Sequence, residues 1–492
     1  MFLLRVLTSE SSYLETGGEK KRGITREGLS IFGVYYIINL MPIHPSKPTG
    51  IRALTIVLVG QAISILASSM TGFALSVWVF QRTSSATNLG IMQTAFNLPY
   101  LLIIPLAGVM VDRYNRKLMM MVSDLAAGLG SVAILFLLLS NNLQVWHFYV
   151  VNIVIGLGSA FQWPAYSAAI TTMVPKEHYA RANGMMSFVH AGPGMVAPLL
   201  AGALLPHIGL QGILLIDIAT FIFAIGALLM VFVPQPERTA DGKAGEGNLA
   251  HEAAFGFKYI FSRPSLFAYV ILLFVANSTL GFSNAAEVPM VLLRTGNNSL
   301  ALGAVETAGA ISWTIGSLLM STWGGPKRRM LGALLGWVGF CVTGNIIFGL
   351  GRGLSVWVPA ILFAGVGSSI GIATSQAILQ AKVAPDVQGR VFAARRVLTW
   401  FPDTLTPILG GLLGDRIMEP ALQPSGVLAG TLGKLTGTGP GAGMSAIMII
   451  FGLLTTLTML SGFLFKRVRN LEDILPDHEQ AAVPEQTEAI TA

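Results

Sequence analysis

Twelve apolar segments, each about long enough to cross a lipid bilayer, constrain the fold of this 492-residue chain more than any other feature. Only 11% of its residues are charged, against about 25% in an ordinary soluble domain. A soluble protein with so few charges would lack a polar surface, so the sequence predicts an all-α membrane protein with twelve transmembrane helices. The predicted spans are residues 53–80, 86–110, 118–139, 146–172, 184–206, 210–234, 265–291, 300–322, 330–350, 355–380, 397–415 and 442–465.

The charges between the segments support this count. Sixteen Lys and Arg residues fall in the loops on one side of the predicted membrane, and five fall in the loops on the other side. Cytoplasmic loops carry the excess of Lys and Arg, and an even number of spans then places both termini in the cytoplasm. The net charge of +7 is spread between apolar segments rather than gathered in one patch, so we expect no nucleic-acid partner.

A polar segment divides the spans into two sets of six. We expect an N-terminal half at 53–234, a cytoplasmic linker at 235–264 that contains an amphipathic helix, and a C-terminal half at 265–466. A repeat at a fixed offset of 209 residues supports the division, because a parallel repeat implies two related halves with a substrate path between them. The eight identities are Gly156/Gly365, Gly158/Gly367, Ser159/Ser368, Val174/Val383, Arg181/Arg390, Pro193/Pro402, Pro198/Pro407 and Gly202/Gly411.

The two ends of the chain do not fit the spans. We expect residues 1–52 to form a poorly ordered N-terminal extension, with three interpretations left open: a piece upstream of the true start, a short surface helix, or a functional segment. Residues 467–492 are rich in Glu, Ala and Thr and predict a disordered cytoplasmic tail.

The loop between the second and third spans contains Gly108, Asp112, Arg113, Arg116 and Lys117 at the spacing of a known signature. This string resembles the loop motif of the major facilitator superfamily, with Asn115 where the motif has glycine. Such a loop can act as a conformational latch, in which Asp112 pairs with cations or a helix N-terminus of the facing half. The alternative is that these charges only fix the topology.

Other segments extend the resemblance. Gly184, Pro193, Pro198 and Gly202 in the fifth span resemble an antiporter motif with several glycines replaced, and also suit plain helix packing. The stretches at 174–184, 388–392, 414–420 and 437–443 look like the macrolide-efflux and enterobactin-exporter branch of the superfamily. The resemblance implies a bacterial-type plasma (inner) membrane protein that exports bulky amphipathic molecules by alternating access in exchange for protons.

Ionisable residues inside spans are costly and are therefore functional candidates. For proton coupling we rank Asp403 first, because it follows Pro402 and lies nearest a helix middle, and then Glu306 and Asp217. Glu287 lies near the outer end of its span. Asp124 is expected to brace Arg113 and Arg116 rather than to carry protons.

A cavity for lipophilic cargo needs aromatic and amide side chains with few fixed charges. The candidates are Gln162, Trp163, His190, Trp313, Trp400 and Phe401. Ordinary helix packing is the alternative for each aromatic residue. We expect no cofactor and no metal site, because Cys341 is the one cysteine and the seven histidines are scattered.

The sequence therefore predicts a monomeric secondary exporter of amphipathic drugs such as macrolides, and not an enzyme. It contains no phosphate-binding loop of an ATP-driven pump. A siderophore or metabolite exporter of the same fold is one alternative, and a membrane sensor that does not transport is another. The expected partners are a small-molecule substrate, protons and the lipid bilayer.

Overall fold

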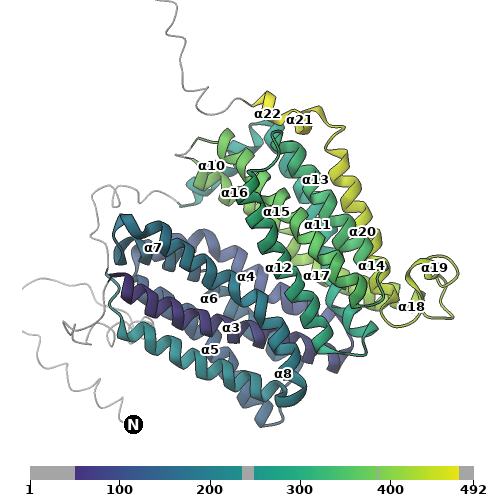
Figure 1. Cartoon of the computed structure of the whole chain (residues 1–492), viewed down its shortest axis with the longest axis horizontal. Helices are drawn as coiled ribbons and strands as arrows, with labels where there is room; N and C mark the ends of the chain where they lie inside the picture. Colours follow the sequence, from purple (N-terminus) through teal and green to yellow (C-terminus); the bar gives the residue numbers. More distant parts are fainter. Residues whose placement is uncertain (1–49, 235–248, 385–386, 476–492) are drawn as a thin grey trace, which may run out of the picture. The chain divides into compact units, whose positions relative to one another are not determined.

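The computed structural model describes residues 50–234, 249–384 and 387–475, and all regular structure within them is helical (Figure 1). The predictions for residues 1–49 and for linker residues 235–248 lie outside the described part of the chain. The N-terminal half contains α3 (Gly50–Thr83), α4 (Ala86–Arg113), α5 (Arg116–Leu139), α6 (Val145–Ser159), α7 (Gln162–Met173) and α8 (Tyr179–Met230).

The C-terminal half begins after the linker helix. Two of its transmembrane passes contain π-helical segments, Val342–Ile347 and Gly414–Met418. Its helices are α10 (Leu249–Phe261), α11 (Pro264–Arg294), α12 (Ser299–Trp323), α13 (Arg329–Cys341), α14 (Phe348–Leu350), α15 (Leu354–Lys382), α16 (Gln388–Trp400), α17 (Pro402–Leu413), α18 (Glu419–Ala421), α19 (Gly433–Thr436), α20 (Ala442–Ser461), α21 (Lys466–Arg469) and α22 (Leu471–Ile474).

Eight helical stretches of the described residues are long and apolar enough to cross a membrane. One of them, Arg181–Met230, has 50 residues, and a helix that rises about 1.5 Å per residue would then be more than twice as long as the roughly 30 Å apolar core of a bilayer. It breaks at Gly209, whose φ of +63° favours glycine, and so makes two passes. Together with α4, α12 and the α16–α17 pair, the described helices make twelve passes.

The passes alternate between two ends of the bundle. We call the end that carries the Lys- and Arg-rich connections at 113–116 and 323–329 the basic end, and α15 ends there at Lys382. The opposite end carries the connections at 83–86, 294–299 and 350–354, together with the long segment at 413–442. Each half therefore begins and ends at the basic end, as an even number of passes requires.

The two halves meet along two helix pairs, α4 with α17 and α8 with α12. Glycines allow close approach there: a Cβ on Gly202 would lie 2.5 Å from the Ser299 carbonyl oxygen, and one on Gly411 would lie 2.6 Å from the Thr87 Cα. Ser299 Oγ also donates to the Gly202 carbonyl oxygen at 2.9 Å. These contacts all lie near the opposite end, so we call the two pairs the seams.

The first part of the predicted disordered tail is folded, which corrects the boundary at residue 467. Helices α21 and α22 bury Val468 and Leu471 against the helices of the C-terminal half. The Glu472 carboxylate accepts a hydrogen bond from the Met330 amide, at 2.9 Å, at the start of α13. The buried side chains of Val468 and Leu471, and the cap that Glu472 provides for α13, fix this segment against the C-terminal half. Its composition alone had predicted disorder. Residues 476–492 lie outside the described part of the chain.

Candidate functional site

A cavity of about 780 Å³ lies between the two halves, and we call it the central cavity. On α4 the seam residues Thr87 and Gly90 precede the cavity residues from Gln93 onward, so the cavity lies on the basic-end side of the seams. It is lined by Gln93, Phe96, Asn97, Tyr100, Leu101, Ile104, Ser159, Ala160, Gln162, Trp163, Pro164, His190, Gly281, Asn284, Arg396, Trp400, Asp403, Thr404 and Pro407. Residues of both halves therefore face one space.

Two interrupted helices bring polar groups to the central cavity. The fourth pass breaks between α6 and α7, just before Gln162 and Trp163, and the eleventh breaks between α16 and α17 at Pro402. Proline lacks an amide hydrogen and cannot continue the backbone ladder, so Pro402 begins a new helical segment. In a membrane, such a break is tolerated where it faces protein or water rather than lipid. Trp400 and Asp403 flank the second break and line the cavity.

Aromatic rings form much of the cavity wall. The Trp163 and His190 rings meet edge to face with centroids 5.2 Å apart, and Phe96 stacks on Tyr100 at 5.8 Å. The Arg396 guanidinium lies 4.2 Å from the centre of the Trp400 ring, which is cation–π distance. Trp163 is 52% exposed, so a large part of its surface is open to a ligand. Such walls suit apolar, aromatic or cationic molecules.

Asp403 is the one carboxylate among the residues that line the central cavity. It lies in the first turn of α17, where the helix dipole favours a negative charge. Its Oδ1 atom would lie 3.4 Å from a Cβ on Gly281, so glycine at that position lets α11 approach the carboxylate. No hydrogen bond to this carboxylate is found in the described part of the chain. Asp403 therefore keeps its acceptor positions available for a proton, water or a ligand.

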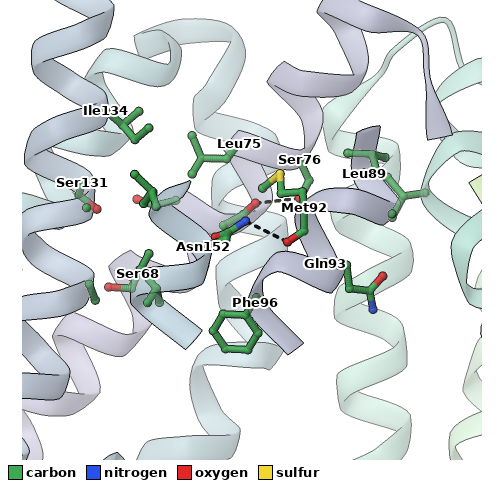
Figure 2. Close-up of a pocket in the computed structure, with 18 of the residues that line it drawn as sticks. Ser68, Leu75, Ser76, Leu89, Met92, Gln93, Phe96, Ser131, Ile134 and Asn152 are labelled. Carbon is green, nitrogen blue, oxygen red and sulfur yellow. Dashed lines mark hydrogen bonds between the residues drawn. The ribbon is translucent and has the colours of Figure 1, made fainter. Parts of the chain in front are cut away.

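Asp217 lies at a different place, in a second cavity of about 430 Å³. Its carboxylate accepts hydrogen bonds from Ser68 Oγ at 2.8 Å and Ser131 Oγ at 2.6 Å. Figure 2 shows these two serines across the second cavity from Gln93, together with the hydrogen bond from Asn152 to the Met92 carbonyl oxygen. Hydroxyl donors thus satisfy the Asp217 carboxylate.

The two cavities meet at shared wall residues. Gln93, Phe96 and Asn284 line both of them, so the two cavities share part of one wall. The N-terminal half supplies most of the second cavity, and α11 supplies the remainder.

Glu306 faces neither cavity but lies close enough to Glu287 for the two charges to repel each other. Glu306 belongs to α12 and Glu287 to α11. Neither carboxylate has a hydrogen-bond donor as partner in the described part of the chain. Glu306 therefore has to be considered together with Glu287.

Asp124 accepts a hydrogen bond from Gln61 Nε2 at 2.6 Å, and the Gln162 amide reaches the same carboxylate. Its described partners are thus amides rather than the Arg116 that it was expected to brace. Gln162 links this buried group to the central cavity, which it also lines.

The predicted latch is only partly described. Gly108, Asp112 and Arg113 belong to α4, but their side chains lie outside the description. Arg116 Nη1 donates to the Ala168 carbonyl oxygen at 2.6 Å, in the last turns of α7. Lys117 Nζ donates to the carbonyl oxygens of Leu229 and Val231 at the end of α8. Both cations thus stabilise helix C-termini of their own half.

The remaining candidates lie elsewhere. Trp313 and Phe401 are 52% and 44% exposed and do not line either cavity. A Cβ on Gly184 would have no neighbouring heavy atom within 4 Å, and Pro193 lies inside α8.

Pro198 and Gly202 pack across the seam against Gly303 and Ser299 of α12. Their repeat partners Pro407 and Gly411 pack against Gly90 and Thr87 of α4.

Several site residues were missed at the level of sequence. Arg396, Asn284, Gln93 and Tyr100 line the central cavity but were not among the predicted residues. A polar side chain inside an apolar segment was the available signal for Gln93 and Asn284. Arg396 lies one helical turn before Trp400, a spacing that places both on one helix face.

A membrane bundle of two related halves, with a cavity between them lined by both, has the architecture of a secondary transporter. The chain matches the family model of the Major Facilitator Superfamily over residues 57–407 and belongs to that family. It is a multi-pass membrane transporter for a small molecule, and not an enzyme.

Similarities to individual proteins extend this assignment. The chain is 25% identical to macrolide efflux protein A of Streptococcus pyogenes over 363 residues, which cover 73% of this chain and 88% of that protein. It is 23% identical to multidrug resistance protein MdtG of Escherichia fergusonii, over 63% of this chain and 73% of that protein. A solved structure of a mutant of the nucleoside transporter NupG has the same fold, with a TM-score of 0.61 and 12% identity over 83% of this chain and 98% of that one.

Proposed function

We propose that this transporter exports amphipathic drugs such as macrolides from the cytoplasm in exchange for protons. The observation that carries the proposal is the central cavity, whose walls combine aromatic rings with one carboxylate that has no hydrogen-bond partner in the described part of the chain. Large apolar molecules with few polar groups suit such walls. The similarity to macrolide efflux protein A supports this substrate class.

The proposed outward direction rests on the similarity to macrolide efflux protein A, and the charges and the seams support an assignment of the state. If the basic end faces the cytoplasm, as positive loops do, the central cavity belongs to an inward-facing state that is closed at the opposite end. Opening of the seams at Gly202 and Gly411, with closure at the basic end, would complete the cycle. In this proposal the loop that contains Asp112 holds the basic end shut in that second state. One chain supplies both walls of the cavity, so a monomer suffices.

Asp403 is our first choice for the coupling carboxylate. It is the acid that a substrate in the central cavity would meet, so a proton and a substrate would influence each other there directly. Asp217 and Glu306 are the reserve candidates, since Asp217 has two serine donors and Glu306 lies beside Glu287.

The test is drug accumulation and growth inhibition in an efflux-deficient bacterial host that expresses the chain. We expect lower accumulation of macrolides or lipophilic cations, abolished by an uncoupler and weakened at least about tenfold by Asp403→Asn. The matched control is Asp473→Asn, which removes an exposed carboxylate near the basic end and should leave efflux unchanged. No change for any compound, with verified membrane insertion, would contradict drug efflux. An effect confined to iron-limited growth would indicate a siderophore exporter instead.

A further inference from the structure

The Asp415 carboxylate joins the two halves at the opposite end of the bundle. Asp415 lies in the π-helical segment Gly414–Met418 that follows α17. It accepts hydrogen bonds from the Ala86 and Thr87 amides, both at 2.9 Å, and from the Ser85 and Thr87 hydroxyls, both at 2.7 Å. Four donors from the start of α4 thus converge on one carboxylate of the other half.

These donors are the groups that a helix start leaves unsatisfied. The first amides of a helix have no partner within the helix, and its N-terminus carries partial positive charge. Ser85 caps α4 by accepting from the Asn88 amide at 3.3 Å, which leaves the Ala86 and Thr87 amides for another acceptor. A carboxylate at that position makes charge-assisted hydrogen bonds, which are stronger than neutral ones.

The contact is specific to one seam. In the α8–α12 seam the position that corresponds to Asp415 in the 209-residue repeat is Pro206, which has no acceptor side chain. There α12 is capped by its own Asn298, whose Oδ1 accepts from the Ala301 amide at 3.1 Å. Of the two described seams, only the α4–α17 seam is closed by a carboxylate from the other half.

The same segment offers an internal comparison. Glu419, four residues after Asp415, accepts from the Met444 amide at 3.1 Å, at the start of α20. Glu419 therefore caps a helix of its own half, and this contact can persist when the halves move. Thr87 and Gly411 pack closely across the seam. An opening of the opposite end would separate them, and the Asp415 contact would then break.

We propose that Asp415 is a gating residue that holds the transporter closed at the opposite end and sets how readily this end opens. The inference rests on the alternating access of the proposed function, but not on the identity of the substrate or the coupling ion. Breaking four hydrogen bonds to one carboxylate is a step that every opening of this seam requires. Loss of the carboxylate should therefore shift the population toward the state open at the opposite end.

The experiment uses two cysteine reporters in the full-length protein, reconstituted in nanodiscs after the native thiol is removed by Cys341→Ala. Ser299→Cys reports on the other seam, where Ser299 is 5% exposed, and Tyr100→Cys reports on the central cavity. With Asp415→Ala we expect the maleimide labelling rate at position 299 to rise roughly tenfold and the rate at position 100 to fall. Asp415→Asn, which keeps an acceptor oxygen but no charge, should give a smaller shift in the same directions.

Glu419→Gln is the matched control, and it should change neither rate, because its helix cap lies within one half. Unchanged rates in Asp415→Ala would overturn the gating role. A rise at both positions would also overturn it, since that pattern indicates a loosened fold rather than a shift between two states. The labelling needs no drug, so it tests the gating role of Asp415 independently of drug efflux. If the two labelling rates shift as expected in a protein that exports no drug, the proposed function fails and the gating role stands.

Discussion

The Trp163 indole and the His190 imidazole meet edge to face in the central cavity, with ring centroids 5.2 Å apart. Trp163 belongs to α7 and His190 to α8, so the pair fixes the position of one cavity wall relative to its neighbour. Edge-to-face aromatic pairs are each worth about 1 kcal/mol beyond the area that they bury. A substrate that stacks on the exposed face of Trp163 would meet a ring that is already held in place.

Trp163→Ala should weaken substrate binding more than it slows transport. The variant removes both a stacking surface and the partner of His190, so we expect the apparent KM for a macrolide substrate to rise roughly tenfold at little changed maximal rate. His190→Phe keeps a ring at the same place and should raise KM far less. Concentration dependence of efflux in cells or vesicles measures both. Equal KM values in Trp163→Ala and the wild type would show that the substrate does not contact this wall.

Gly202→Ala should impair transport through the α8–α12 seam. Its Cβ would lie 2.5 Å from the Ser299 carbonyl oxygen, and because the obstacle is backbone, the helices must separate. We expect the initial efflux rate to fall at least about fivefold. Gly184→Ala, in the same helix with no neighbouring atom within 4 Å of the new Cβ, should transport normally. Similar efflux rates for Gly202→Ala and Gly184→Ala would mean that transport does not depend on the close approach of α8 and α12 at Gly202.

Lys117→Met should lower stability and leave transport specificity unchanged. The ammonium group donates to the Leu229 and Val231 carbonyl oxygens at the C-terminus of α8, and a methionine keeps the stem but loses the donor. The expected cost is about 1 to 2 kcal/mol, seen as a fall of a few degrees in the melting temperature in detergent. The control is Lys466→Met, where the lysine is exposed at the start of α21. An unchanged melting temperature in Lys117→Met would show that this helix cap does not stabilise the fold.

The sequence predicted the fold class because its signals can be read without knowing which helices pack together. Apolar segments, alternating basic loops and the 209-residue repeat do not depend on which helices touch. Pro198 and Gly202 matched an antiporter-like motif that also suits helix packing, but their neighbours across the seam, Gly303 and Ser299, became known only from the structure. The folded start of the tail was missed for the same reason, since Leu471 is buried by helices far away in the sequence.

The site was predictable only in part. Gln162, Trp163, His190, Trp400 and Asp403 line one cavity, whereas Trp313 and Phe401 line neither cavity. The face of a helix that a side chain occupies is set by its neighbours, and composition does not report it. The sequence around Asp415 gave no sign of its role. Its four hydrogen-bond donors lie far away in the chain, and Ser85 precedes Asp415 by 330 residues.

The most direct test of proton-coupled export through Asp403 is drug movement in proteoliposomes under an imposed pH gradient. We predict that the gradient drives macrolide accumulation by the wild-type protein and that Asp403→Asn still binds the drug but no longer responds to the gradient. Asp217→Asn in parallel shows whether the second cavity shares this role. Gradient-driven accumulation of the same size in Asp403→Asn and the wild type would contradict proton coupling through Asp403.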